Sequence, residues 1–183
     1  MRLYRVIYYD ENADLHEPGG ALYIPPQGTY RIDNPSEYGV LYAGDSPSGV
    51  CAEAFYRGVY RMTWNPKMLR PLPGGHRRVL AWYDADDATP VCVLDDPQEL
   101  IDHRLRPSSV ITRDYTVTQA WALDIFAQGI FAGVSWWSYC DSRSTTVGLW
   151  DRTVIRSHGV EELTIAHPAL AEAATIVGVR VRS

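Results

Sequence analysis

The sequence has few cysteines, no surplus of positive charge and no long apolar run. Its 183 residues include three cysteines, Cys51, Cys92 and Cys140, which are odd in number and widely spaced. They fit neither a disulfide framework nor the paired cysteine spacing of a zinc site. This usage is typical of a reduced compartment, so we expect a cytoplasmic protein.

The charge pattern disfavours nucleic acid as a partner. The 17 basic and 22 acidic side chains give a formal net charge of -5, and arginines alternate with aspartates and glutamates along the chain. No basic stripe is present that would neutralise a phosphate backbone, so direct binding of DNA or RNA is not expected. The N-terminal stretch turns acidic by Asp10, and no apolar run approaches membrane-spanning length, so we expect neither secretion nor membrane insertion.

The overall composition is that of a folded domain. Hydrophobic residues make up 46% and charged residues 21% of the chain, close to globular averages. No break in composition divides the chain, so we expect one domain over residues 1–183. Predicted strands mostly follow one another, with few helices between them, which favours an α+β fold over a regular parallel sheet.

Local patterns predict the individual elements. The expected strands are 3–9, 39–43, 78–83, 90–94, 130–137, 147–150 and 174–181, with 78–83 and 90–94 forming a hairpin. The expected helices are 47–58, 96–105 and 116–128. Breakers make 10–28 a long loop, of a kind that often covers a pocket.

Two of these helices carry specific start signals. Ser46 is placed to cap helix 47–58, with Pro47 preset for its first turn. The stretch Thr116-Val117-Thr118-Gln119 matches a capping box for helix 116–128. The expected buried faces are Cys51, Ala54, Phe55 and Gly58 for the first helix, and Ala120, Trp121, Ile125 and Phe126 for the second.

Three polar side chains at equal spacing suggest a chemical site. Arg31, Tyr42 and Glu53 are eleven residues apart. A guanidinium grips phosphate, a phenol ring stacks on a charged heterocycle, and a carboxylate stabilises developing positive charge. Glu53 lies more than about 100° from the centre of its helix's expected buried face, so it points to solvent or into a cleft. The combination indicates NAD.

Each of these residues also has an ordinary structural interpretation. Arg31 fits a surface turn, Tyr42 a half-buried strand, Glu53 a solvated helix face, and Ser138 a strand end that bonds backbone. The five histidines show no metal-ligand spacing and the acidic turn 84–87 does not match a calcium loop, so no metal site is expected. The Gly74-Gly75 pair lacks the downstream residues of a phosphate-binding P-loop.

Several segments together resemble the RES domain family. They are Leu3-Tyr4-Arg5-Val6, Tyr30-Arg31-Ile32-Asp33-Asn34-Pro35, Gly39-Val40-Leu41-Tyr42-Ala43 with Ala52-Glu53, Gly133-Val134-Ser135-Trp136-Trp137-Ser138, and Val147-Gly148-Leu149-Trp150-Asp151. Two features depart from the pattern. Isoleucine follows Arg31 where an aromatic residue is expected, and Ser142 and Ser144 compete with Ser138 as the family serine.

The resemblance implies a fold similar to ADP-ribosyltransferases, with mixed sheets and NAD held in a central cleft. It implies an NAD-degrading toxin of a bacterial toxin-antitoxin pair. Arg31, Tyr42 and Glu53 would be its catalytic residues, and Arg5, Tyr30 and Ser138 would bind NAD.

The expected reaction is cleavage of the nicotinamide-ribose bond of NAD by phosphorolysis or hydrolysis. The leaving group is a cationic pyridinium that departs neutral, so this chemistry requires no metal. Inorganic phosphate or water is the acceptor. A protein ADP-ribosyltransferase and an inactive binding module for a helix-turn-helix antitoxin are the alternatives. The sequence leaves open whether the chain forms a homodimer.

Overall fold

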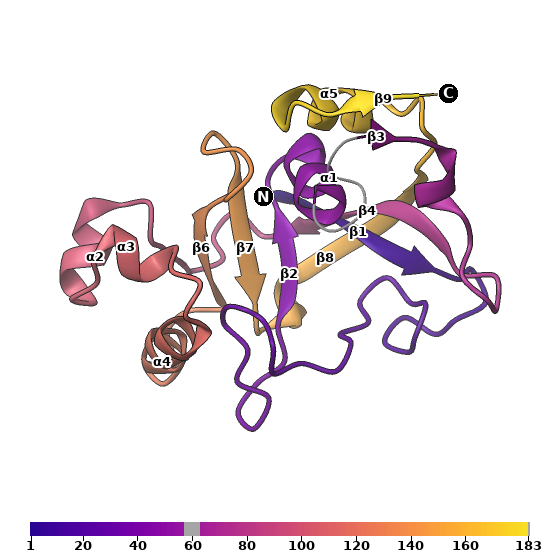
Figure 1. The fold of residues 1–183 in the computed structure, drawn as a ribbon. Helices are drawn as coiled ribbons and strands as arrows, with labels where there is room; N and C mark the ends of the chain where they lie inside the picture. Colours follow the sequence, from indigo (N-terminus) through magenta and orange to yellow (C-terminus); the bar gives the residue numbers. More distant parts are fainter. Residues whose placement is uncertain (57–62, 183) are drawn as a thin grey trace.

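A computed structural model describes residues 1–56 and 63–182 (Figure 1). A seven-stranded mixed sheet has the order β5-β6-β7-β2-β1-β4-β8, and a small parallel sheet pairs β3 with β9. The strands are β1 (Arg2–Tyr9), β2 (Leu41–Gly44), β3 (Thr63–Trp64), β4 (Arg77–Ala85), β5 (Val91–Val93), β6 (Gly133–Trp137), β7 (Thr145–Leu149), β8 (Ile155–Glu162) and β9 (Arg180–Val181). The α+β class with mixed sheets is confirmed.

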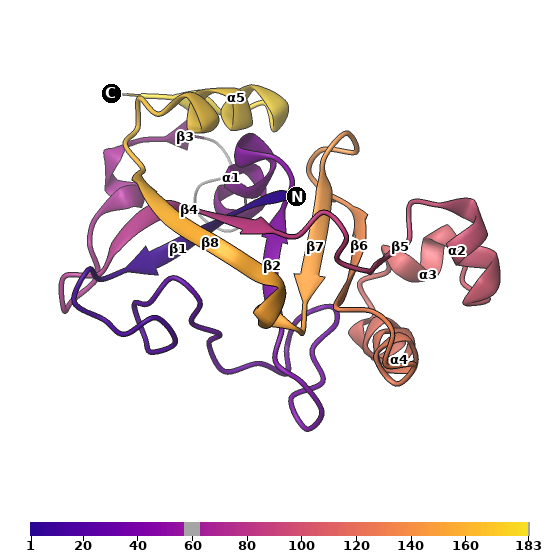
Figure 2. The ribbon, with the colours of Figure 1, turned by 180° about the vertical axis from the view of Figure 1, so that it is seen from behind.

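Helices pack against both halves of this sheet. They are α1 (Pro47–Phe55), α2 (Pro97–Asp102), α3 (Pro107–Val110), α4 (Tyr115–Phe126) and α5 (Pro168–Ile176), with 3-10 turns η2 (Pro66–Leu69) and η3 (Arg152–Val154). Figures 1 and 2 show α1 and α5 together over the β1 side, and α2 to α4 beyond β6. Within the described residues, no helix is long and apolar enough to cross a membrane.

The large sheet consists of two halves with a narrow join. Strand β1 pairs with β4 over eight residues but meets β2 at the single register pair Tyr4↔Gly44. In Figures 1 and 2, β2, β6 and β7 run in a different direction from β1 and β8. The two halves therefore diverge on either side of the join.

Three apolar clusters stabilise this arrangement. Alternation along β2 places Val40 and Tyr42 against the cluster under α4, while Leu41 is fully buried in the cluster on the other face. The predicted core position of Leu41 is thus confirmed. A third cluster joins α1 to α5 through Phe55 and Leu170.

Helix α1 begins as the sequence predicts. The Ser46 hydroxyl accepts a hydrogen bond from the Gly49 N–H at 3.1 Å, with Pro47 in the first turn. The buried face differs in one position, because Ala52 is buried and Ala54 is exposed. The helix ends at Phe55, and the predicted extension to Gly58 lies outside the described residues.

The predicted hairpin of 78–83 and 90–94 is wrong. Strand β4 pairs with β1 and β8, whereas β5 is a three-residue edge strand parallel to β6. The longer ladder of β4 with β1 offers eight paired positions and buries Leu80 and Tyr83. Tertiary pairing therefore prevails over the local turn signal.

Two further local predictions are also wrong. Residues 174–176 belong to α5, which starts at Pro168 and is rich in alanine, so only Arg180–Val181 are extended. Helix α4 is capped by Asp114, whose carboxylate accepts from the Thr116 N–H at 3.1 Å, and not by a capping box at Thr116. Its buried face includes Ala122, while Ala120 is exposed.

Candidate active site

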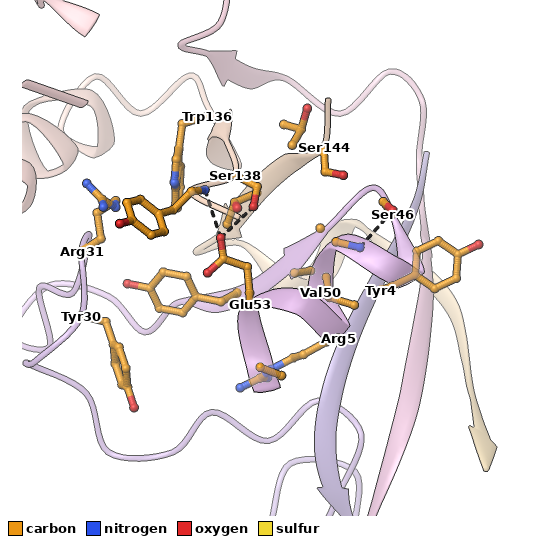
Figure 3. Close-up of a pocket in the computed structure, with 18 of the residues that line it drawn as sticks. Tyr4, Arg5, Tyr30, Arg31, Ser46, Val50, Glu53, Trp136, Ser138 and Ser144 are labelled. Atoms are coloured by element: carbon orange, nitrogen blue, oxygen red, sulfur yellow. Dashed lines mark hydrogen bonds between the residues drawn. The ribbon is translucent and has the colours of Figure 1, made fainter. Parts of the chain in front are cut away.

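A cavity of about 370 Å³ lies where the two halves of the sheet diverge. This volume falls within the range of roughly 300 to 1,000 Å³ typical of small-molecule sites. Figure 3 shows side chains from β1, α1, the β6 end and the loop before β2 meeting there. The lining includes all six predicted site residues: Arg5, Tyr30, Arg31, Tyr42, Glu53 and Ser138.

The Glu53 carboxylate is held at the wall of this cavity by the turn after β6. Its Oε1 accepts hydrogen bonds from the Ser138 hydroxyl at 2.7 Å, the Tyr139 N–H at 3.1 Å and the Cys140 N–H at 3.4 Å. Helix α1 supplies the other constraint, because its capped first turn fixes the rotation that aims Glu53 inward. Glu53 therefore faces a cleft and not bulk solvent.

Ser138 is the serine that contacts Glu53. It is buried directly after β6, and its N–H donates to the Ser144 carbonyl at 2.8 Å. Ser142 is exposed and does not line the cavity. Ser144 lines the cavity, but its hydroxyl donates to Asp141 Oδ2 at 3.3 Å.

Arg31 lies on the opposite wall and is anchored to the segment between α3 and α4. Its Nη1 donates to the carbonyls of Val110 at 2.6 Å and Thr112 at 2.8 Å. The guanidinium carbon also lies 5.7 Å from the centre of the Tyr115 ring. These contacts fix the direction of a side chain that would otherwise sample many rotamers.

The isoleucine after Arg31 has a packing explanation. Ile32 is fully buried, and a Cβ added at Gly148 of β7 would lie 2.4 Å from its Cδ1. The side chain thus occupies space that Gly148 leaves open. A branched aliphatic chain suits this close approach to a neighbouring strand better than a bulky ring.

Tyr42 lines the cavity, and its hydroxyl also links β2 to the loop that precedes it. Its hydroxyl donates to Asp33 Oδ1 at 2.7 Å and accepts from the Ile32 N–H at 3.1 Å. Burial, followed by the hydrogen bond to Asp33, raises the pKa of Tyr42 well above its usual range. Its ring centre lies 6.0 Å from that of Tyr30 and 6.5 Å from that of Trp136.

Asp33 is a component of the site that sequence reasoning missed. This carboxylate is 2% exposed, and its Oδ2 accepts the N–H groups of Gly28, Thr29 and Tyr30 at 2.8, 3.1 and 2.9 Å. It therefore shapes the loop that carries Arg31. The available signal was an aspartate in a Gly/Asn/Pro-rich turn, where such side chains commonly bind backbone N–H groups.

Arg5 brings a second guanidinium to the cavity from β1. Its Nη1 donates to the Tyr23 carbonyl at 3.2 Å. Burial lowers the pKa of Arg5, but an arginine stays protonated near neutrality because its ordinary value is so high. A cation placed in this way suits an anionic ligand.

Aromatic side chains complete the lining. Tyr30 is 50% exposed, and its carbonyl accepts from Gln119 Nε2 at 2.9 Å. Five aromatic lining residues that were not assigned to the site from sequence are Tyr4, Tyr115, Trp136, Trp137 and Tyr139. The adjacent tryptophans next to Ser138 were the available signal. Aromatic walls suit planar rings.

Fold and site together define an α+β protein with a small-molecule cleft that combines arginines, aromatic rings and a fixed carboxylate. A family model for the RES domain matches residues 2–170, and the chain belongs to the RES domain family. This confirms the resemblance found in the sequence. No curated protein matches the chain.

One similar solved structure is that of the M. tuberculosis MbcT-MbcA toxin-antitoxin complex. The match has a TM-score of 0.57 at 15% sequence identity and covers 97% of this chain and 88% of that chain. At this identity the likeness establishes the fold.

Proposed function

We propose that this protein is a toxin-like enzyme that consumes NAD by breaking the nicotinamide-ribose bond, with residues 1–183 acting as one catalytic domain. The observation that carries the proposal is the meeting of Glu53 and Ser138 with Arg31 and Arg5 around one cavity. These groups match the parts of NAD, which joins a cationic ring and two riboses through a pyrophosphate. Membership of the RES domain family supports the same assignment.

Binding is assigned to the arginines and the aromatic walls. Arg31 and Arg5 would hold phosphate oxygens, for which a guanidinium provides several donors in one plane. Tyr42 would present its ring to nicotinamide, while its hydroxyl stays bonded to Asp33. Tyr30 would close the mouth of the cavity, and Ser138 would hydrogen-bond the substrate.

Chemistry is assigned to Glu53. When the bond between ribose C1 and the pyridinium nitrogen breaks, its electron pair stays on nitrogen and nicotinamide leaves neutral. Positive charge develops on the ribose, and a nearby carboxylate stabilises it. The hydrogen bonds to Glu53 Oε1 hold the carboxylate in place before the reaction, so little reorganisation is needed.

Phosphate is the preferred acceptor, with water as the second. A phosphate dianion is already a nucleophile and needs only to be positioned, whereas water benefits from a well-placed base. Attack of a phosphate oxygen on C1 gives ADP-ribose-1″-phosphate, nicotinamide and a proton. Glu53 could itself serve as a base for water, so hydrolysis is the second proposed reaction.

A cognate antitoxin is proposed as the protein partner. The similar solved structure is that of a toxin-antitoxin complex, and a cell that makes an NAD-consuming enzyme needs an inhibitor of it. We propose that the chain acts in the cytoplasm, where NAD is available and where its three free cysteines stay reduced.

The test is incubation of purified protein with NAD, with and without inorganic phosphate, followed by mass spectrometry of the products. Nicotinamide release with ADP-ribose-1″-phosphate proportional to phosphate supports phosphorolysis. ADP-ribose alone, at a rate independent of phosphate, supports hydrolysis. Intact NAD with well-folded protein contradicts both and favours the binding module.

Expression in bacteria provides the second test. The proposal predicts a fall in cellular NAD and growth arrest on induction, both absent for Glu53→Ala. Label from NAD appearing on cellular proteins would favour protein ADP-ribosylation instead. Normal growth and normal NAD despite abundant folded protein would contradict the toxin assignment.

A further inference from the structure

A cluster of three side chains with metal-ligating atoms lies at the β5 edge of the sheet, outside the cavity. Cys92 is on β5, Glu99 is on α2, and His103 is the residue that ends α2. The cysteine sulfur, one carboxylate oxygen and one ring nitrogen all lie within 4.8 Å of one another. Figure 2 shows β5 beside α2 and α3, beyond β6.

Two of the three distances between the ligand atoms match the edges of a tetrahedral zinc site. Cys92 Sγ lies 3.6 Å from Glu99 Oε2, and His103 Nε2 lies 3.4 Å from the same oxygen. With ordinary zinc bond lengths, tetrahedral ligand atoms are roughly 3.3 to 3.6 Å apart. The third pair, the sulfur and the ring nitrogen, lies within 4.8 Å, so side-chain rotation can bring all three atoms around a single ion.

The surroundings also suit an ion. The exposed fractions of the His103 and Glu99 side chains are 12% and 30%, so solvent reaches the cluster and water can supply a fourth ligand. Gln128 Nε2 lies 3.3 Å from His103 Nδ1. If the amide is turned, its oxygen accepts the Nδ1–H, which leaves Nε2 as the metal-binding nitrogen.

We propose that Cys92, Glu99 and His103 form a binding site for a borderline-soft divalent cation, with zinc as the preferred ion and water in the fourth position. A thiolate, an imidazole and a carboxylate together favour zinc over magnesium or calcium. Binding replaces the thiol proton of Cys92, which is released to solvent. The ion would clamp α2 to β5, whose residue Cys92 is in register with Val134 of β6.

This site does not change the metal-free chemistry assigned to NAD cleavage. Histidine spacing alone does not reveal this ligand set, because the tertiary structure assembles it. Glu99 and His103 are four residues apart on one helix face, but the cysteine comes from a neighbouring strand. The proposed role of the ion is structural.

The test uses purified protein stripped with a chelator and titrated with Zn²⁺ and then with Co²⁺. We expect one equivalent of tightly bound metal, a rise in the melting temperature, and a thiolate-to-cobalt charge-transfer band. His103→Gln and Cys92→Ala should each weaken binding by at least about 100-fold, since changes even to supporting residues commonly cost 10- to 100-fold. Both should abolish the thermal shift.

Matched controls are His158→Gln, an exposed histidine on β8, and Cys51→Ala, a buried free cysteine in another cluster. Both should bind metal like the wild type. Because Cys92→Ala removes a core side chain, His103→Gln decides the matter if Cys92→Ala fails to fold. Unchanged metal affinity in folded His103→Gln, or a cobalt complex without the thiolate band, would overturn the proposal.

Discussion

The hydroxyl of Tyr42 donates to Asp33 across 2.7 Å, and this contact ties β2 to the loop that carries Arg31. Asp33 in turn accepts three backbone N–H groups of that loop. The two residues thereby fix the entrance wall of the cavity. Their energetic and catalytic effects can be separated by substitution.

Tyr42→Phe keeps the aromatic wall but leaves the Asp33 carboxylate and the Ile32 N–H without their phenol partner. A buried polar group that loses its partner costs about 1 to 3 kcal/mol. We expect this loss in the free energy of unfolding, and a larger rise in KM for NAD than fall in kcat. Denaturant unfolding and steady-state kinetics measure the two effects. Tyr8→Phe, which removes an exposed phenol on β1, is the control. Equal stability of Tyr42→Phe and wild type would contradict the structural tie.

The serine assignment can be decided with three alanine variants. Ser138→Ala removes the 2.7 Å hydrogen bond to Glu53, so we expect NAD cleavage to fall about 10-fold, as the carboxylate loses one of its orienting donors. Ser142→Ala should leave the rate unchanged, because that side chain is exposed and outside the cavity. Ser144→Ala should have an intermediate effect. A rate loss in Ser142→Ala alone would reject Ser138.

Glu53→Ala and Glu53→Gln test the charge on the carboxylate. Loss of one preorganised charge contact commonly costs 10² to 10³ in rate, or roughly 3 to 4 kcal/mol of barrier. We expect both variants to lose this much kcat, since a glutamine side chain keeps the shape of glutamate without its charge. Circular dichroism and thermal melting report the fold. Full turnover in folded Glu53→Ala would remove Glu53 from the mechanism.

Arg31→Lys tests whether guanidinium geometry matters beyond charge. Arg31 Nη1 donates to two carbonyls while the side chain faces the cavity, and a single ammonium has no planar fork to do both. We expect a large loss of kcat/KM with folding preserved. Arg143→Lys, on an exposed arginine paired with Asp141, is the matched control. Near wild-type kinetics in Arg31→Lys would show that charge alone is sufficient.

The dependence of the free energy of unfolding on alkaline pH tests the burial of two acidic groups, the Cys51 thiol and the Tyr83 phenol. Burial raises the pKa of Cys51 from 9.0 to about 12 and the pKa of Tyr83 from 10.0 to about 12. At a pH between the ordinary pKa and the raised pKa, each group has released its proton in the unfolded chain but keeps it in the folded protein. The free energy of unfolding therefore falls as pH rises from about 9 to 12. Each group contributes roughly 1.4 kcal/mol per pH unit. Cys51→Ala should flatten the dependence of unfolding free energy on pH, and an unaltered slope would contradict the assignment.

Sequence patterns predicted the parts of this fold whose signals are local. The Ser46 cap and the alternation around Leu41 both follow from short-range spacing. The strand partners of 78–83 and 90–94 did not, because pairing depends on chain segments far apart. The turn around Asp33 signals its bonds to local backbone N–H groups, but its hydrogen bond to Tyr42 is not visible in the sequence.

The α4 start and the C-terminal segment show the same limit. Asp114 and Thr116 both precede an apolar run, and the sequence alone does not show which of the two side chains accepts from an N–H group in the first turn of the helix. Thr118 instead donates its hydroxyl to the Arg31 carbonyl. The segment 174–181 has strand-forming residues at its end, but the alanines and Pro168 before them extend a helix to Ile176.

The contacts that hold the site connect distant parts of the chain. The Ser138 bond to Glu53 spans 85 positions, and the Arg31 bond to Val110 spans 79. On the ribosome, a nascent chain that ends before Ser138 has made Arg31 and its anchors Val110 and Thr112, but its Glu53 has none of the donors from the turn after β6. The wall that holds Glu53 would therefore form only late in translation, once Ser138, Tyr139 and Cys140 have been added.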